Sequence, residues 1–144
     1  MFKREKKKAK IGLALGGGGA RGFTHIGVLK AFEEYGIKFD AIAGTSVGSL
    51  IGAFYAAGYS YEQMYRIARE IEMKDIKTNK IFFMPSKTDG IEKLIVDELG
   101  DINIEDLKVP FVAVAVDLKT TEEIHLNKGN LAKAVAGSCC VPGI

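Results

Sequence analysis

Ser46 is the residue of this sequence with the clearest potential for chemistry, because glycines stand two positions before it and two positions after it. The run is Gly44-Thr45-Ser46-Val47-Gly48. On a sharp turn between a strand and a helix, a serine hydroxyl is exposed, and the flanking glycines relieve the crowding of that turn. The positive end of the following helix would favour an alkoxide and a negatively charged intermediate. The pattern predicts a nucleophile, and the alternative is an ordinary helix N-cap.

A second glycine cluster, Gly16-Gly17-Gly18-Gly19-Ala20-Arg21-Gly22, directly follows the apolar run Ile11–Leu15. Glycine lets the backbone turn tightly and bring bare N–H groups against an anion or an oxyanion. A helix that opens at this loop adds its own positive end. We therefore expect the loop to supply donors for negative charge, and the alternative is a tight turn that binds nothing.

The spacing Gly17-x-Gly19-x-x-Gly22 also matches the fingerprint of dinucleotide-binding domains. That fingerprint requires an acidic residue at the end of the second strand. Asp40 has roughly the right spacing, but it stands at the start of the predicted strand. Because Phe23 rather than a lysine follows Gly22, the loop is not a P-loop. Nucleotide binding stays a minor alternative.

Periodicity predicts the elements that position the two motifs. Alternating strands and helices indicate an α/β layered fold with a mainly parallel sheet, and both motifs follow the carboxyl ends of strands, where ligands bind. Capping boxes at Ser60 and Asp89 open two helices, with an irregular stretch over residues 74–90 between them. The other predicted elements are strands at 11–15, 39–43, 111–116 and 122–126, and helices at 20–35, 46–57 and 130–138.

Composition indicates one soluble globular domain, with 144 residues, 47% of them hydrophobic and 26% charged. The apolar run Ile11–Leu15 is too short for a signal peptide, so we expect a cytoplasmic protein. Residues 1–10 hold six basic residues and one acidic residue. They are interpreted as a flexible solvated tail, and the alternative is a peripheral contact between residues 3–10 and an anionic membrane surface. The tail lacks the aromatic residues of a nucleic-acid site.

The two cysteines and two histidines add little catalytic potential. The adjacent residues Cys139 and Cys140 have no further cysteine to complete a metal site or a disulfide framework, so we expect small packing residues. We expect His25 to pack against the glycine loop. Asp117 and His125 follow Ser46 in the order of an α/β-hydrolase triad, which remains a minor alternative because the nucleophile comes so early in the chain.

The two motifs together resemble the opening of bacterial patatin-like phospholipases. The similarity runs over essentially residues 11–144. The segments that carry it are Leu15-Gly16-Gly17-Gly18-Gly19-Ala20-Arg21-Gly22, His25-Ile26-Gly27-Val28-Leu29, Gly44-Thr45-Ser46-Val47-Gly48, Val114-Ala115-Val116-Asp117-Leu118 and Ala136-Gly137-Ser138-Cys139-Cys140-Val141-Pro142-Gly143-Ile144.

This resemblance implies a three-layer α/β/α sandwich that hydrolyses acyl esters of phospholipids or lysophospholipids, without metal or cofactor. It implies a Ser–Asp dyad with Ser46 as the nucleophile. It assigns the oxyanion hole to backbone N–H groups of Gly17, Gly18 and Gly19. Arg21 takes the place of the basic residue of the motif. Supporting glycines are Gly22, Gly44 and Gly48.

One feature departs from the family pattern. The dyad aspartate belongs to an Asp-Gly-Gly or Asp-Gly-Ala motif beyond the Pro-Gly turn, whereas the one Asp-Gly here is Asp89-Gly90, which precedes a predicted helix. We interpret Asp89 as an N-cap. Residues 11–144 are therefore expected to form a C-terminally incomplete domain whose dyad aspartate lies outside the chain. A non-catalytic lipid-binding or regulatory module is the alternative function.

Overall fold

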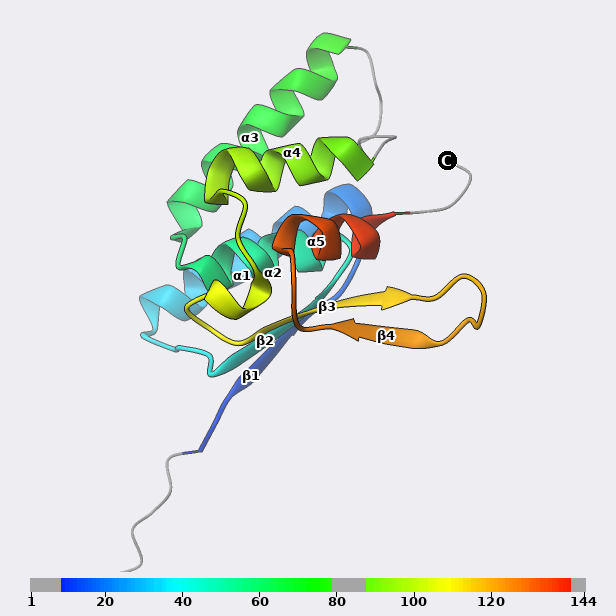
Figure 1. The fold of residues 1–144 in the computed structure, drawn as a ribbon. Coiled ribbons are helices and arrows are strands. Elements are labelled where there is room, and N and C mark those ends of the chain that lie inside the picture. The colour runs from blue at the N-terminus through cyan, green and yellow to red at the C-terminus, as the bar shows by residue number, and fades with distance from the viewer. Residues whose placement is uncertain (1–8, 79–87, 141–144) are drawn as a thin grey trace, which may run out of the picture.

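A computed structural model describes residues 9–78 and 88–140 (Figure 1). Most of the predicted basic tail therefore lies outside the described residues. In chain order the elements are β1 (Gly12–Leu15), the 3-10 helix η1 (Gly19–Phe23), α1 (Thr24–Glu34), β2 (Ala41–Thr45), α2 (Val47–Ala57), α3 (Tyr61–Thr78), α4 (Thr88–Leu99), the 3-10 helix η2 (Ile104–Asp106), β3 (Phe111–Val116), β4 (Glu123–Leu126) and α5 (Leu131–Cys139).

The four strands form one mixed sheet in the order β1-β2-β3-β4. The first two pairs are parallel and β4 runs antiparallel to β3, so the sheet is mainly parallel, as the sequence predicts. Leu15 at the end of β1 pairs with Gly44 near the end of β2. Because adjacent parallel strands end at the same edge of a sheet, the glycine loop and the Ser46 turn leave the sheet side by side.

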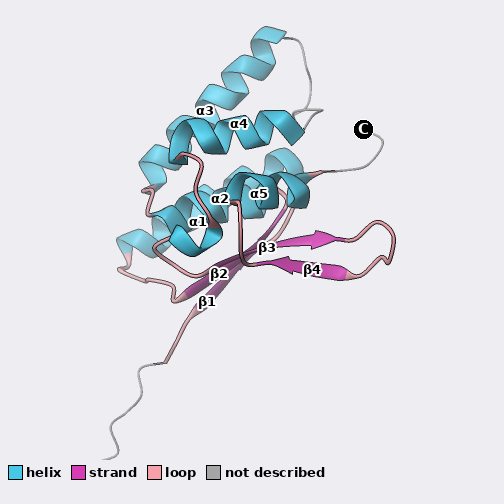
Figure 2. Ribbon diagram, in the orientation of Figure 1, coloured by secondary structure: helices cyan, strands magenta, loops and turns pink. Residues whose placement is uncertain are grey.

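The described helices lie on one side of the sheet (Figure 2). Side chains of alternate strand residues point to opposite faces. Leu15, Ile42 and Phe111 are buried on the helical side, whereas Ala41 and Thr45 are exposed. The predicted α/β fold with a mainly parallel sheet is confirmed, and the described residues place its helical layers over one face.

α2 is the central helix of this layer. It contains no charged residue, and nine of its eleven residues are buried against the sheet and the neighbouring helices. A helix that is apolar on all sides requires burial on all sides. Gly58 ends it in the left-handed conformation, with φ of 94°. No described helix combines the length and apolar composition needed to cross a membrane.

The outer helices α3 and α4 agree with the sequence prediction only in part. The capping box is present: Gln63 Oε1 accepts a bond of 2.8 Å from the Ser60 N–H, and Ser60 Oγ accepts one from Gln63. α3 continues to Thr78, so residues 74–78 are helical rather than irregular. No glycine or proline interrupts the sequence there, although the apolar periodicity has faded. α4 begins at Thr88, which places Asp89 inside its first turn rather than at the N-cap.

β2 begins two residues later than the predicted strand at 39–43. Asp40 fixes the start, because its N–H donates to the Ile11 carbonyl and its carboxylate accepts the Ile11 N–H, both at 2.8 Å. Phe39 leaves the sheet instead. Its ring packs edge-on against Phe32 and Tyr55, at centroid distances of 5.0 and 6.1 Å.

Ile95 tests how much the packing of α4 on α5 stabilises the domain. The Ile95 side chain is 0% exposed, whereas that of its neighbour Val96 is 39% exposed. We expect Ile95→Ala to lower the free energy of unfolding by about 2–5 kcal/mol, because it removes buried methyl groups and leaves a cavity. Val96→Ala, the matched control, should cost far less. Urea unfolding followed by circular dichroism measures both, and equal losses would contradict this packing.

Candidate active site

Ser46 lies on the turn between β2 and α2, the context that its motif predicts. Its backbone has φ of 54° and ψ of −129°. A non-glycine residue with positive φ carries strain of about 1–3 kcal/mol, and such residues gather at functional sites. Ser46 occupies the position before the helix, but its side chain makes no capping hydrogen bond. The N-cap alternative therefore does not explain why a serine stands here.

Gly44 and Gly48 are required by close backbone contacts around this turn. A Cβ on Gly44 would lie 2.5 Å from Ser49 Cα, inside the first turn of α2. A Cβ on Gly48 would overlap the Leu15 carbonyl oxygen and lie 2.6 Å from that of Gly16. The first turn of α2 therefore packs directly on the backbone where β1 becomes the glycine loop, and only glycine fits at either position.

The glycine loop lies against Ser46. A Cβ on Gly17 would be 3.3 Å from Ser46 Cβ. Within the described part of the chain, neither the Gly17 N–H nor the Gly18 N–H donates a hydrogen bond to a backbone carbonyl. Gly19 opens η1, and the first N–H groups of a helix lack intrahelical acceptors. The structure thus brings the serine and a row of backbone donors together.

Residues beyond the loop fix its position. A Cβ on Gly22 would overlap the Val47 side chain, so η1 packs closely on the start of α2. His25 Nε2 donates to the Gly16 carbonyl oxygen at 2.8 Å, which confirms the expectation that this histidine packs against the loop. Arg21 is exposed beside the loop, and its N–H donates to the Gly18 carbonyl.

Asp117 and His125 do not pair with each other, although both lie near the β3–β4 turn. The Asp117 carboxylate accepts backbone N–H bonds from Thr120 and Lys119, and these bonds lower its pKa. His125 Nε2 instead lies 2.5 Å from a carboxylate oxygen of Glu123. Asp117 therefore has a structural role at the end of β3, and the triad alternative lacks its Asp–His contact.

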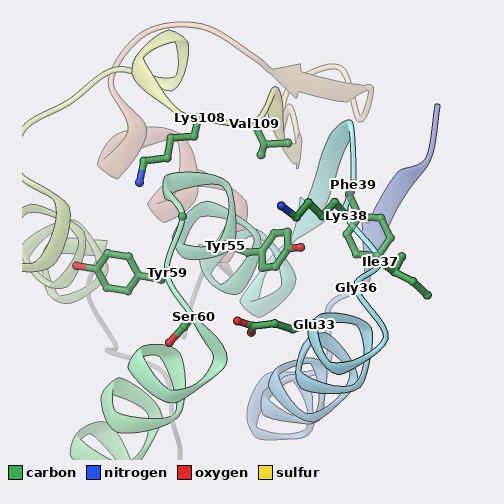
Figure 3. A pocket seen from close by; sticks show the side chains of 11 residues that line it. Glu33, Gly36, Ile37, Lys38, Phe39, Tyr55, Tyr59, Ser60, Lys108 and Val109 are labelled. Carbon is green, nitrogen blue, oxygen red and sulfur yellow. The ribbon is translucent and has the colours of Figure 1, made fainter. Parts of the chain in front are cut away.

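Asp40 and a nearby hollow also lie away from Ser46. Asp40 precedes β2, at the opposite end of the strand from the glycine loop, so it cannot act as the acid of a dinucleotide site. A hollow of about 390 Å³ lies near that same end, with Lys38 and Lys108 on either side of Tyr55 (Figure 3). Ser46 does not line it, so the hollow is separate from the candidate site.

The last turn of α5 contacts the start of α2 through Ser138 and Cys139. No motif in the sequence predicts this contact. Ser138 Oγ accepts the Ser46 N–H at 2.9 Å and donates to the Val114 carbonyl at 2.6 Å. The Cys139 thiol is buried, with its sulfur 3.9 Å from Ser49 Oγ. The run of small residues around 138 was part of the family resemblance. However, only the folded chain shows a contact between residues 92 positions apart.

Gly48 tests the backbone packing of the site. We expect Gly48→Ala to destabilise the fold by about 3 kcal/mol or more, because the added methyl group meets the carbonyl oxygens of Leu15 and Gly16. Gly27→Ala is the matched control, since Gly27 lies within α1 with nothing near its missing Cβ. It should be neutral or stabilising by about 0.5–1 kcal/mol. Thermal unfolding compares them, and a silent Gly48→Ala would disprove this packing.

The reactivities of Cys139 and Cys140 test how the last turn of α5 is buried. Burial raises the pKa of Cys139 to about 11, against the smaller opposing effect of the Ser49 and Ser46 hydroxyls. We expect a disulfide reagent at pH 8 to modify exposed Cys140 rapidly and Cys139 only on unfolding. Because the folded-state pKa is raised, the Cys139 contribution to stability is complete below pH 9 and is lost as pH rises toward 11. Rapid reaction of both native thiols would contradict this arrangement.

Comparison with protein families and curated proteins extends the resemblance found in the sequence. The model of the patatin-like phospholipase family matches residues 13–144. Neuropathy target esterase sws from Drosophila persimilis is 38% identical over 141 residues, covering 92% of this chain and 10% of the relative. The Drosophila melanogaster protein of the same name matches with the same identity and coverage.

Solved structures share the fold at much lower sequence identity. The type III effector protein ExoU matches with a TM-score of 0.64 and 14% identity, over 93% of this chain and 40% of that chain. The heterodimeric ExoU–SpcU complex of Pseudomonas aeruginosa matches with a TM-score of 0.67 and 17% identity, over 94% and 37% of the two chains.

These matches cover nearly all of this chain, although it spans only about a tenth of the length of the curated relatives. The family model includes the glycine loop, the Ser46 turn and α5, which the structure places side by side. The chain therefore belongs to the patatin-like phospholipase family.

Proposed function

We propose that this chain carries the nucleophile and the oxyanion hole of a serine hydrolase that cleaves acyl esters of phospholipids or lysophospholipids. One observation above all supports the proposal: the strained turn of Ser46 lies directly against Gly17, and among the described residues the N–H groups of Gly17 and Gly18 have no backbone acceptor. Family membership supports ester hydrolysis as the reaction, because the family is named for phospholipases and its matched relatives are named as esterases.

In the proposed reaction, Ser46 Oγ attacks the acyl carbonyl carbon and its proton passes to a base. The carbonyl oxygen becomes an oxyanion that accepts N–H bonds from the segment Gly17–Gly19, where one lost donor typically costs about 2.7–4 kcal/mol. Collapse of this intermediate expels the lipid alcohol, which takes up the proton, and leaves the acyl group on Ser46. Water then attacks the acyl-enzyme by the same route and releases the fatty acid.

The base of this proposal is an aspartate that does not belong to residues 1–144. Among the described residues, no carboxylate is recorded in contact with the Ser46 hydroxyl, while Asp117 and Asp40 are engaged elsewhere. The start of α2 behind Ser46 contributes the positive end of a buried helix, which favours the oxyanion. The aspartate would then have only to accept the proton.

Contacts with the lipid head group and the membrane surface complete the proposal. Arg21 is exposed beside the glycine loop, where its guanidinium can meet a lipid phosphate. Residues 3–10 hold six basic side chains, and each would add on the order of 1 kcal/mol of attraction to an anionic surface. We therefore propose a cytoplasmic protein that acts at the membrane periphery.

A second candidate function is a non-catalytic lipid-binding or regulatory module. The lack of a recorded carboxylate at the Ser46 hydroxyl, among the described residues, favours it for residues 1–144 taken alone. The two functions differ in one respect that can be measured. A binding module takes up lipid without releasing fatty acid, whereas the hydrolase turns lipid over in the longest natural form of the protein.

Labelling with a fluorophosphonate probe tests the nucleophile. We expect the probe to modify Ser46 in the longest natural form of the protein, because an activated serine attacks its phosphorus. Ser46→Ala should abolish labelling and lower esterase activity by roughly 10³-fold or more. Ser60→Ala is the control, since Ser60 caps α3 away from the site. Peptide mass spectrometry locates the modified residue.

The outcomes of this experiment separate the two functions. Full esterase activity in Ser46→Ala, or labelling at another serine, would refute the hydrolase proposal. Phospholipid binding without labelling or turnover would establish the binding module instead. Turnover by residues 1–144 as fast as by the longest form would show that the base lies within this chain.

A further inference from the structure

We propose that Ser138 is a positioning residue for Ser46, which holds the strained turn by linking the Ser46 backbone to β3. The inference rests on the proposed role of Ser46 as a nucleophile. The structural basis of the proposal is a pair of hydrogen bonds, which we call the Ser138 bridge. The Ser46 N–H donates to Ser138 Oγ, and the Ser138 hydroxyl donates to the Val114 carbonyl oxygen.

Both bonds of the Ser138 bridge have ordinary hydrogen-bond lengths, at 2.9 Å for the N–H donor and 2.6 Å for the O–H donor. A serine hydroxyl has one hydrogen to donate. That hydrogen goes to the Val114 carbonyl, because a carbonyl oxygen can only accept, and a lone pair then faces the Ser46 N–H. The orientation of the hydroxyl is therefore fixed, and the two strands' backbones are tied through one side chain.

The Ser138 bridge stands where the β2–β3 ladder would continue. The Ile42 N–H donates to the Pro110 carbonyl at 2.9 Å. In a parallel ladder every second residue repeats such a bond, so the same offset sets the Ser46 N–H opposite the Val114 carbonyl. β2 ends at Thr45, however, and the positive φ of Ser46 turns the chain away. The Ser138 hydroxyl lies between the Ser46 N–H and the Val114 carbonyl and forms a hydrogen bond with each of them.

The Ser138 bridge affects which backbone conformation Ser46 adopts. Without the hydroxyl, the Ser46 N–H and the Val114 carbonyl lose their partners, at a cost of about 1–3 kcal/mol for a buried group. The backbone can recover that cost if Ser46 relaxes to an extended conformation and bonds Val114 directly. Such relaxation also removes the strain of positive φ, and it would swing Ser46 Oγ away from the glycine loop. Ser138 therefore opposes the relaxation.

The core of the domain places Ser138 independently of the site. Asn130 is the N-cap of α5, and its side chain accepts the Lys133 N–H at 3.0 Å. The buried face of α5 packs against α4, α2 and β3, and Leu131 and Val135 are 0% exposed. Ser138 is only partly buried on the last turn of this anchored helix. Its hydroxyl thus reaches Ser46 from a rigid support.

Three variants and one control test the Ser138 bridge. Ser138→Ala removes both hydrogen bonds, and Ser138→Thr keeps a hydroxyl. Ser138→Cys keeps the size of the side chain with a thiol that bonds weakly. Cys140→Ala, at an exposed neighbouring position, controls for changes at the end of α5. If Ser138→Ala does not fold, Ser138→Cys gives the same test with little change in packing.

The first measurement is the backbone conformation of Ser46, from the NMR shifts of its amide and its α and β carbons in residues 1–144. We expect Ser138→Ala and Ser138→Cys to shift these signals away from positive-φ values. Ser138→Thr and Cys140→Ala should leave them in place. Unchanged Ser46 signals in both Ser138→Ala and Ser138→Cys would overturn the inference, whether or not the protein is a hydrolase.

The second measurement is the rate of fluorophosphonate labelling at Ser46 in the longest natural form. We expect Ser138→Ala and Ser138→Cys to label roughly 10–100-fold more slowly, because a displaced nucleophile loses its alignment. Ser138→Thr and Cys140→Ala should stay within about 3-fold of the native rate. Native labelling rates in Ser138→Ala would overturn the positioning role. A native protein that takes no label would refute the proposed function, while the NMR signals would still decide whether the bridge holds the turn.

Discussion

The left-handed backbone of Ser46 is the constraint on which the rest of this site depends. A strand that ends in a positive φ breaks its hydrogen-bond ladder and needs space for a sharp turn. Gly44 and Gly48 provide that space, because backbone atoms occupy the positions of their missing side chains. Ser138 restores the interrupted ladder step from α5. The strained turn is therefore accommodated by residues of three separate elements, β2, α2 and α5.

The same edge of the sheet collects the groups that the proposed chemistry needs. β1 and β2 are parallel neighbours, so their following loops meet. The start of α2 then lies behind the serine while the glycine loop lies beside it. α2 itself is nearly completely buried, and its low-polarity surroundings strengthen the effect of its positive end on nearby charge. The end of α2 and the backbone N–H groups of the glycine loop thus favour negative charge at the site, with few charged side chains involved.

Local sequence signals predicted the parts of the structure that depend on local chemistry. The strand–turn–helix context of Ser46 and the capping box of α3 both depend on residues a few positions apart. Predicted element boundaries were wrong where contacts between residues far apart in the chain determine them. The start of β2 is set by Asp40 bonding Ile11, and periodicity alone cannot report such a bond. α3 continues into the predicted irregular stretch, because a fading apolar stripe does not by itself end a helix.

Ser138 shows why the candidate site itself was only half predictable. Its segment was recognisable as part of a family pattern, but a serine near the end of a small-residue helix has no chemical signature of its own. Its significance comes from the pairing of β2 with β3 and the packing of α5, which place its hydroxyl between two backbone groups. Motifs identify the reacting atoms, whereas tertiary contacts determine what holds them.

The central claim is that Ser46 attacks an acyl carbonyl whose oxygen is received by the glycine loop. A crystal structure of the longest natural form after reaction with a fluorophosphonate tests this most directly. We expect phosphorus bonded to Ser46 Oγ, with its oxygen about 2.7–3.1 Å from backbone nitrogens within Gly17–Gly19. A phosphoryl oxygen directed away from that loop, or an adduct on another residue, would contradict it.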